Sequence, residues 1–148
     1  AAGADVAEIL RRAQMVGART ELYAALSTVK YLAMSGRIGH LAAGMATMLS
    51  IKPILTVRDG KLDMLEKART QSRAWARVIE LTATRLGGRC PERLAIVHVD
   101  ALQAAQDLVD QLRRVVPCPP EIPLWSLGAG LSVHAGAGLV GVAMVAAP

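Results

Sequence analysis

The chain is organised around its last stretch, Leu127-Gly-Ala-Gly-Leu-Ser-Val-His134-Ala-Gly136-Ala-Gly138-Leu-Val-Gly-Val-Ala-Met-Val145. No Asp, Glu, Lys or Arg follows Glu121, and His134 is the one titratable side chain in the quoted stretch. Such a stretch is a membrane span, a buried terminal strand or a ligand site.

The membrane alternative is the weakest of the three. The uncharged run that begins at Ile122 is long enough to cross a bilayer, which takes about 20 residues. Pro123 and the glycines oppose a continuous helix, however, and no basic cluster flanks the run to orient it. We therefore expect no membrane span, and we predict that Leu139–Val145 is a central strand, buried on both faces and preceded by a glycine-rich turn that carries His134.

The size and composition of the chain indicate a single domain with an aliphatic core. Its 148 residues are close to the usual size of one compact unit. Of these residues 53% are hydrophobic, only 3% are aromatic and none is Phe. No internal repeat or change of composition divides the chain, so we predict one domain over residues 1–148.

The charge favours an anionic partner. A net charge of +5 and a pI near 9.8 suit phosphate, carboxylate, nucleic acid or an acidic protein surface, although a solvated basic surface explains them equally simply. Cys90 and Cys118 have neither the number nor the spacing of a disulfide framework or a zinc site, which favours the cytoplasm. The first residues lack an initiator Met and the features of a signal peptide, so we expect a fragment of a longer protein.

Apolar spacing and turn residues predict alternating helices and strands. Strands are expected at 20–26, 51–57, 62–68, 94–99, 122–127 and 139–145, and helices at 5–17, 27–34, 40–49, 70–86 and 100–112. Asp59-Gly60 between the second and third strands predicts a tight hairpin, and Pro53 predicts that its strand starts there or lies at an edge. The succession of strand, helix and strand over 94–127 predicts a parallel βαβ unit. The fold class is therefore α/β, with a mixed sheet, a β-hairpin, a βαβ unit and helices packed on the sheet.

His134 is the main candidate for a functional side chain. A lone histidine usually has a structural role, but a donor side chain beside exposed backbone N–H groups forms a cradle for a carboxylate or phosphate. Gly136 and Gly138 would expose such groups. Ser132 lies two residues before His134, a spacing that does not establish a catalytic pair.

A second candidate site is basic. No acidic residue occurs between Leu22 and Arg58, whereas this part of the chain includes Arg37, which glycines flank. A guanidinium there binds an anion or closes a structural salt bridge. Nucleic acid is not expected, because stacking aromatics do not accompany the basic residues. No phosphate-binding loop, dinucleotide motif, nucleophile elbow or metal-ligand spacing occurs, so we expect no cofactor, no metal and no independent enzyme.

Four ordered blocks of the sequence resemble the C-terminal domain of the DegV family of bacterial fatty-acid-binding proteins, from about Thr20 to the end. They are Tyr31-Leu-Ala-Met-Ser-Gly-Arg-Ile-Gly39, Leu49-Ser-Ile-Lys-Pro-Ile-Leu-Thr-Val-Arg-Asp-Gly-Lys61, Leu65-Glu-Lys-Ala-Arg-Thr70 and Val133-His-Ala-Gly-Ala-Gly-Leu-Val-Gly-Val142. The resemblance implies the C-terminal half of a two-domain protein whose N-terminal domain is absent. It also implies that a long-chain fatty acid is held between and within the domains.

In the family, a histidine in a Thr-His-x-Gly-Pro-Gly block helps to hold the acyl carboxylate. By resemblance this residue is His134, with Gly136 and Gly138 as the glycines. Val133 replaces the usual Thr and Ala137 the usual Pro, so Ser132 is the remaining candidate for a hydroxyl contact.

Several family members are lipid-binding subunits that present the carboxylate to a separate fatty acid kinase, which forms acyl phosphate. The resemblance therefore makes this chain a non-catalytic carrier, with Arg37, Arg58 and Arg69 as candidates for partner docking or anion binding. The alternative is a protein-interaction domain that uses this basic surface to bind an acidic partner and retains no lipid.

Overall fold

The computed structural model describes residues 3–35 and 50–147, and it consists of a six-stranded mixed sheet with helices on both sides. The order of the strands across the sheet is β3-β2-β1-β6-β4-β5. Their bounds are β1 Thr20–Ala25, β2 Lys52–Arg58, β3 Lys61–Ala68, β4 Arg93–His98, β5 Leu124–Ser126 and β6 Val140–Val145. The predicted α/β class with a mixed sheet is confirmed.

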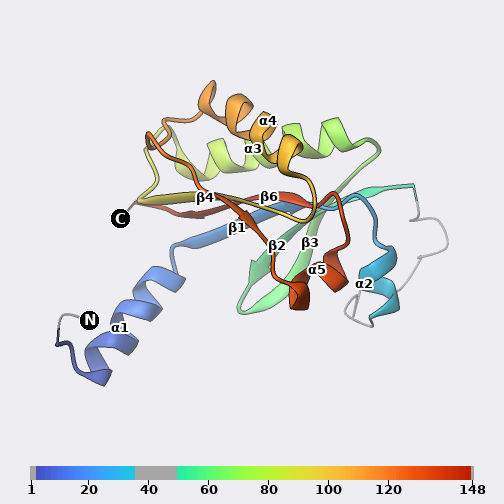
Figure 1. Cartoon of the computed structure of the whole chain (residues 1–148). Helices are drawn as coiled ribbons and strands as arrows, with labels where there is room; N and C mark the ends of the chain where they lie inside the picture. Colours follow the sequence, from blue (N-terminus) through green and yellow to red (C-terminus); the bar gives the residue numbers. More distant parts are fainter. Residues whose placement is uncertain (1–2, 36–49, 148) are drawn as a thin grey trace.

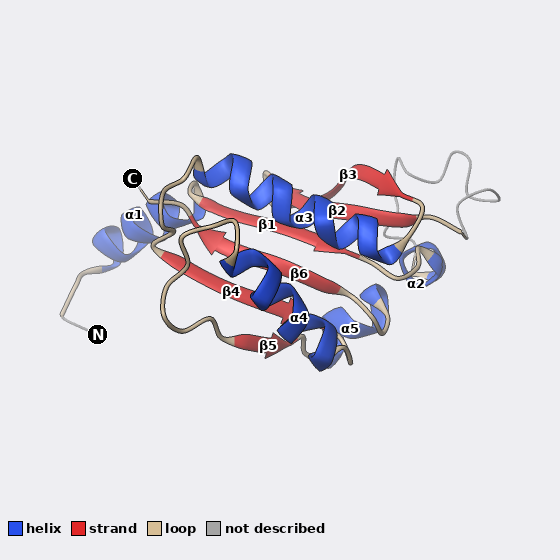
Figure 2. Ribbon diagram, turned by 90° about the horizontal axis from the view of Figure 1, so that it is seen from above, coloured by secondary structure: helices blue, strands red, loops and turns tan. Residues whose placement is uncertain are grey.

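Five helices accompany the sheet in the described residues. They are α1 Val6–Gly17, α2 Lys30–Met34, α3 Gln71–Leu86, α4 Leu102–Arg113 and α5 Ala129–Ala135. The two long helices α3 and α4 lie side by side over one face of the sheet (Figures 1 and 2). The short helices α2 and α5 lie on the opposite side, near one end of the strands, and no other helix of residues 3–35 and 50–147 packs on that face (Figure 1).

The quoted C-terminal stretch does supply a central strand. β6 lies between β1 and β4 and is antiparallel to both, with Val142 opposite Tyr23 on one side and Ile96 on the other. Val140 and Val142 are completely buried. A continuous apolar run suits this position because both faces of the strand are covered over part of its length.

The predicted hairpin is also present. β2 and β3 pair antiparallel around Asp59-Gly60, and both turn residues have positive φ, 50° and 71°. Such a turn matches the twist of the flanking strands. β2 begins at Lys52, one residue before Pro53, as predicted, but the strand lies inside the sheet between β3 and β1 rather than at its edge.

The predicted βαβ unit is formed by β4, α4 and β5, whose strands pair parallel. Its helix begins at Leu102, two residues later than predicted: Asp100 has a positive φ of 44°, and Ala101 occupies the N-cap without a side-chain hydrogen bond. The Ala101 N–H instead donates to His98 Nδ1 at 3.4 Å. Asp100 thus adopts a left-handed backbone conformation, which Asp tolerates better than most residues.

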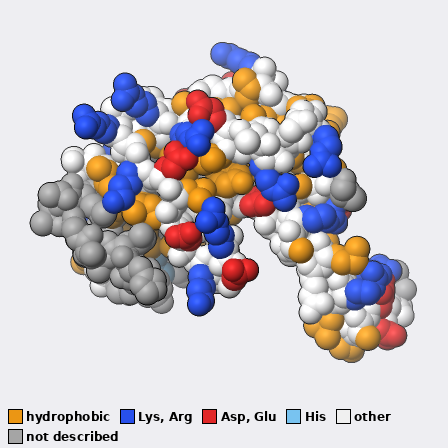
Figure 3. Space-filling model, turned by 180° about the vertical axis from the view of Figure 1, so that it is seen from behind, with side chains coloured by type: hydrophobic (Ala, Val, Ile, Leu, Met, Phe, Trp, Pro, Cys, Tyr) orange, Lys and Arg blue, Asp and Glu red, His pale blue; other side chains and the backbone are white. Residues whose placement is uncertain are grey.

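Capping residues mark the start of α1 and the end of α3. The Asp5 side chain accepts a 2.8 Å hydrogen bond from the Glu8 N–H, and Gly87 ends α3 in the left-handed conformation. α3 buries one face on the sheet, whereas α1 buries no residue and projects away from the sheet (Figure 1). Seen from behind, α1 stands apart from the body of the protein, and hydrophobic side chains are visible between the charged ones across this side (Figure 3).

Alternate residues of the strands divide the buried side chains into two clusters. Tyr23, Ile96 and Val142 belong to the cluster under α3 and α4. Ala24 and Val97 belong to a smaller cluster on the other face, together with residues of α2 and α5. The strand period of two residues therefore sends alternate side chains to two faces. One face is covered by α3 and α4; the other, which we call the open face, has helical cover at one end only in the described part of the chain.

Three sequence predictions need comment. The second helix is shorter than predicted, beginning at Lys30 rather than at 27 or 28, and the strand predicted at 122–127 is reduced to Leu124–Ser126. The helix predicted at 40–49 lies outside the described residues. No helix within 3–35 or 50–147 is long and apolar enough to cross a membrane.

Candidate functional site

A cavity of about 1290 Å³ lies on the open face of the sheet. We call it the open-face pocket. Its wall is mainly aliphatic, and its residues come from β1, β2, β3, β4 and β6 and from α2 and α5; they include Leu22, Ala24, Leu55, Leu131, His134 and Ala143. A concave, mostly apolar surface with few polar groups is the usual form of a site for an apolar small molecule.

The floor of the open-face pocket is made of small residues. Ala143 on β6 lies opposite Leu22 on β1 and Ala95 on β4. One pair further along, Gly141 lies opposite Ala24 and Val97. These short side chains leave space above the middle of the sheet that larger residues would fill.

His134 lies in helix α5 rather than in a turn, which corrects the sequence prediction. α5 runs from Ala129 to Ala135, and Gly136, with a φ of 75°, ends it. Glycine at this position permits the abrupt change of direction from helix to β6. The short helix, which contacts α2, holds His134 over one end of the open-face pocket.

The imidazole of His134 is half-buried and contributes to the pocket wall. Its Nδ1 atom is shielded from solvent and has no hydrogen-bond partner among residues 3–35 and 50–147. A buried polar atom without a partner is costly, by about 1–3 kcal/mol. A ligand with a polar group at this end of the pocket would remove that cost.

The other three predicted residues of this segment, Ser132, Gly136 and Gly138, contact other parts of the protein. The Ser132 hydroxyl donates a 2.7 Å hydrogen bond to the Leu127 carbonyl, so its single proton is already engaged. At Gly136 and Gly138 neighbouring side chains occupy the space that a Cβ would need. A Cβ added to Gly136 would lie 2.3 Å from Tyr31 Cδ2, and one added to Gly138 would lie 3.0 Å from Ser27 Cβ. Both glycines are therefore required for close packing as well as for positive φ.

Arg58 and Arg69, the two predicted basic residues within the described part of the chain, lie far apart. Arg58 lies at the hairpin end of β2, where its guanidinium is 3.7 Å from the Asp63 carboxylate. Arg69 directly follows β3, at the other end of a strand of eight residues, about 25 Å away. Arg69 is exposed at the end of the sheet where β2 begins, and Arg37 lies outside the described residues.

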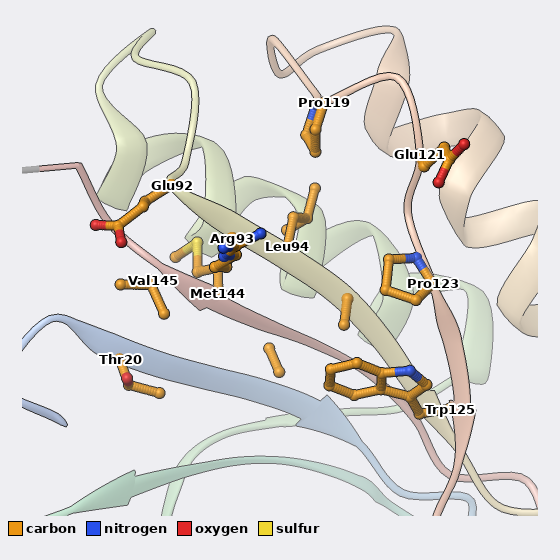
Figure 4. Close-up of a pocket in the computed structure, with 12 residues that line it drawn as sticks. Thr20, Glu92, Arg93, Leu94, Pro119, Glu121, Pro123, Trp125, Met144 and Val145 are labelled. Carbon is orange, nitrogen blue, oxygen red and sulfur yellow. The ribbon is translucent and has the colours of Figure 1, made fainter. Parts of the chain in front are cut away.

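A second, smaller cavity of about 650 Å³ lies beside β4 and β5, toward the β5 edge of the sheet, and shares Thr20 and Ala143 with the open-face pocket. Glu92, Val145 and Thr20 lie at one end of it and Trp125 and Pro123 at the other (Figure 4). Two of its charged residues are Glu92 and Arg93, and Glu92 is ion-paired with Arg19 at 2.6 Å. The open-face pocket is the better site for an apolar ligand because it is larger and more uniformly aliphatic.

Sequence reasoning missed the aliphatic floor of the pocket. The alternation of β1 held the signal, since Leu22 and Ala24 face the pocket while Tyr23 and Ala25 face the helices. The sequence of β6 gave no such signal, because its apolar run is continuous. No local pattern connects Ala143 with α5, which only the fold brings to the same face.

Comparison with known proteins places this architecture in a family. A family model described as an uncharacterised protein of the DegV family matches residues 1–147. A DegV domain-containing protein of Streptomyces coelicolor is 38% identical over 141 residues, which are 95% of this chain and 50% of the relative. The chain thus spans about half the length of the curated relatives it matches.

Solved structures give the same result. A DegV family protein from Corynebacterium glutamicum superimposes with a TM-score of 0.89 at 32% identity, covering 99% of this chain and 55% of that protein. A fatty-acid-binding DegV family protein from Streptococcus agalactiae has a TM-score of 0.79 at 25% identity, covering 99% and 51% of the two chains. The fold and the sequence agree over nearly the whole chain: it belongs to the DegV family.

Proposed function

We propose that this chain binds a long-chain fatty acid in the open-face pocket, with the acyl carboxylate beside His134. The observation that carries the proposal is the buried Nδ1 of His134, which has no described partner and lies at one end of a large aliphatic cavity. The fatty-acid-binding relative from S. agalactiae supports the same ligand class.

The chemistry of the pocket suits the two parts of such a ligand. Each methylene group removed from water contributes about 0.8 kcal/mol, so the acyl chain supplies most of the affinity. The strands give the pocket a length of the right order, since β1 extends about 20 Å at about 3.3 Å per residue. The imidazole N–H supplies a hydrogen bond to the carboxylate, which fixes the direction in which the fatty acid lies.

Gly136 and Gly138 would shape the end of the open-face pocket that holds the carboxylate. Their small size lets Tyr31 and Ser27 pack against the segment that follows His134. Ser132 contributes by supporting α5 through its bond to Leu127, since its proton is not available to a carboxylate.

We further propose that the bound carboxylate is presented to a separate fatty acid kinase. That enzyme would transfer the γ-phosphoryl group of ATP to a carboxylate oxygen, which yields acyl phosphate and ADP. The chain itself would orient the substrate and would not supply the phosphoryl-transfer machinery. For docking, Arg69 is better placed than Arg58. Arg69 lies at the end of the sheet where β2 begins, and the turn that follows His134 lies at the same end. Arg37 remains a docking candidate from the sequence.

A protein-interaction domain without lipid is the second candidate function. It is favoured by the apolar side of α1, whose side chains are exposed: Val6, Ile9, Leu10 and Val16. The two functions differ in what the purified protein carries. Native mass spectrometry after gentle purification would show a bound fatty acid for the carrier and none for the interaction domain.

The role of His134 is tested by His134→Ala, with Val133→Ala as the matched control. Val133 belongs to the same helix, is exposed and does not contribute to the pocket wall. Loss of a hydrogen bond to a charged group should weaken fatty acid binding by roughly ten- to a hundredfold in a calorimetric titration, whereas the control should bind like the unsubstituted protein. Equal affinities for all three proteins would remove His134 from the site.

A further inference from the structure

Three segments that are distant in the sequence meet beside the turn that follows α5. The Lys52 ammonium, at the start of β2, donates a 2.5 Å hydrogen bond to the carbonyl oxygen of Ser27. The Ser27 hydroxyl in turn donates a 2.5 Å hydrogen bond to the carbonyl oxygen of Ala137. Lys52 is thereby linked through Ser27 to the middle residue of the turn Gly136–Gly138.

This turn needs support from outside itself. Gly136 and Gly138 have φ of 75° and 87°, and glycine loses more conformational freedom on folding than any other residue. Ala137 between them is exposed, so its own side chain gives little packing. A turn of this composition does not hold one conformation without contacts from neighbouring segments.

Ser27 makes such contacts in two ways. Besides bonding to Ala137, it packs so closely on Gly138 that a Cβ added there would lie 3.0 Å from Ser27 Cβ and 3.1 Å from Ser27 Oγ. The Gly138 N–H is also fixed, by a 2.8 Å hydrogen bond to the Val99 carbonyl. The position of the turn therefore depends on where the backbone of Ser27 lies.

Lys52 fixes that backbone. A charged donor makes a hydrogen bond roughly twice as strong as a neutral one, and this bond joins residues 25 positions apart in the sequence. Lys52 is half-buried, so its bond to the Ser27 carbonyl is less exposed to competing water than a surface contact would be.

We propose that Lys52 is a positioning residue for the carboxylate end of the open-face pocket, an inference that rests on the proposed function. Through Ser27 it holds the turn Gly136–Gly138 in place, and the turn sets the orientation of His134 two residues earlier. Lys52 does not contribute to the pocket wall, so it acts through the turn and not by touching the fatty acid.

The test compares Lys52→Met, Lys52→Arg and Ser27→Ala with Lys67→Met as the matched control. Lys67 is exposed on the adjacent strand β3, opposite Pro53. The first readout is hydrogen exchange of the Gly138 amide, measured by NMR together with the imidazole resonances of His134. The second is the affinity for palmitate.

Lys52→Met should speed up exchange at Gly138 about tenfold, shift the His134 resonances and weaken palmitate binding about tenfold. Ser27→Ala should do the same, and the double variant should show less than the sum of the two effects because both act on one chain of hydrogen bonds. Lys52→Arg should restore part of the affinity, and Lys67→Met should change neither readout.

The two readouts separate this inference from the proposed function. If the unsubstituted protein binds no fatty acid, the proposed function fails, while the exchange measurement still decides whether Lys52 fixes the turn. If the unsubstituted protein binds palmitate but Lys52→Met leaves either Gly138 exchange or palmitate affinity unchanged, the positioning role of Lys52 is overturned.

Discussion

Gly141 on β6 lies directly opposite Ala24 on β1, and a Cβ added to Gly141 would lie only 2.6 Å from the Cβ of Ala24. It would also lie 2.8 Å from two backbone atoms, Ala24 Cα and the Tyr23 carbonyl oxygen. The two central strands therefore approach each other at a point where no side chain fits, and this keeps the floor of the open-face pocket low.

This contact predicts that Gly141→Val is strongly destabilising. Backbone atoms of β1 would have to move, and overpacking of this kind costs roughly 1–3 kcal/mol in the free energy of unfolding. Gly17→Ala is the control, because nothing lies within 4 Å of the added Cβ, and it should change that free energy by less than about 1 kcal/mol. Urea denaturation measures both variants, and equal stabilities would refute the close approach.

Filling the pocket should weaken lipid binding without unfolding the protein. Ala143 contributes to the pocket floor and is not completely buried, so Ala143→Phe places a ring in the cavity instead of the core. We expect palmitate affinity to fall at least about tenfold, since the ring removes space for several methylene groups. Ala76→Phe, at an exposed position of α3, serves as the control. Undiminished binding by Ala143→Phe in a calorimetric titration would place the ligand elsewhere.

The ion pairs of Arg77 should stabilise the fold in a pH-dependent way. Its guanidinium donates to both carboxylate oxygens of Glu66, at 2.7 and 2.8 Å, and this holds the pKa of Glu66 below its ordinary value of 4.5. A lowered carboxyl pKa contributes stability that is present above the ordinary value and is lost as the pH falls below it.

Arg77→Met should therefore lower the free energy of unfolding by about 0.5–1 kcal/mol near neutral pH, a modest amount because the pair is partly exposed. The difference from the unsubstituted protein should be smaller at about pH 3 than near neutral pH, because the ion pair is lost as falling pH protonates Glu66. Thermal denaturation at both pH values measures it, and a difference that grows on acidification would contradict the assigned pair.

The two cysteines should react at different rates. Burial raises the pKa of the Cys118 thiol, an effect that Arg113 opposes and Cys90 increases, whereas Cys90 itself is exposed. Because the thiolate is the reactive form, alkylation by iodoacetamide near neutral pH should modify Cys90 first, and the rate at Cys118 should rise as the solution becomes more alkaline. Mass spectrometry of digests, with Cys90→Ser as the control, would reveal the order. Faster modification of Cys118 would show that its thiol is not buried as described.

The sequence predicted the parts of this fold that depend on local patterns. The apolar run at Val140–Val145, the Asp59-Gly60 turn and the left-handed Gly87 each carry a signal that a few neighbouring residues determine. These features account for the central strand, the hairpin and the end of α3.

The remaining parts depend on long-range contacts. α5 has two glycines at or near its start and only seven residues, too few to be stable alone, so its existence reflects packing rather than propensity. The pocket floor and the link from Lys52 to Ser27 join segments that have no common local pattern. His134 was thus named as a candidate from the sequence, whereas the helix that carries it and the cavity beneath it required the fold.

The central claim, a fatty acid lying in the open-face pocket with its carboxylate at His134, is tested most directly by locating the ligand. Uniformly ¹³C-labelled palmitate bound to the protein should give intermolecular NOEs from its methylene protons to the methyl groups of Ala24, Leu55 and Leu131, which contribute to the wall of the open-face pocket and not to that of the second cavity. The methylene group next to the carboxylate should give NOEs to the His134 ring. NOEs confined to the cavity at Trp125 and Pro123, with none to His134 or Ala24, would contradict the account.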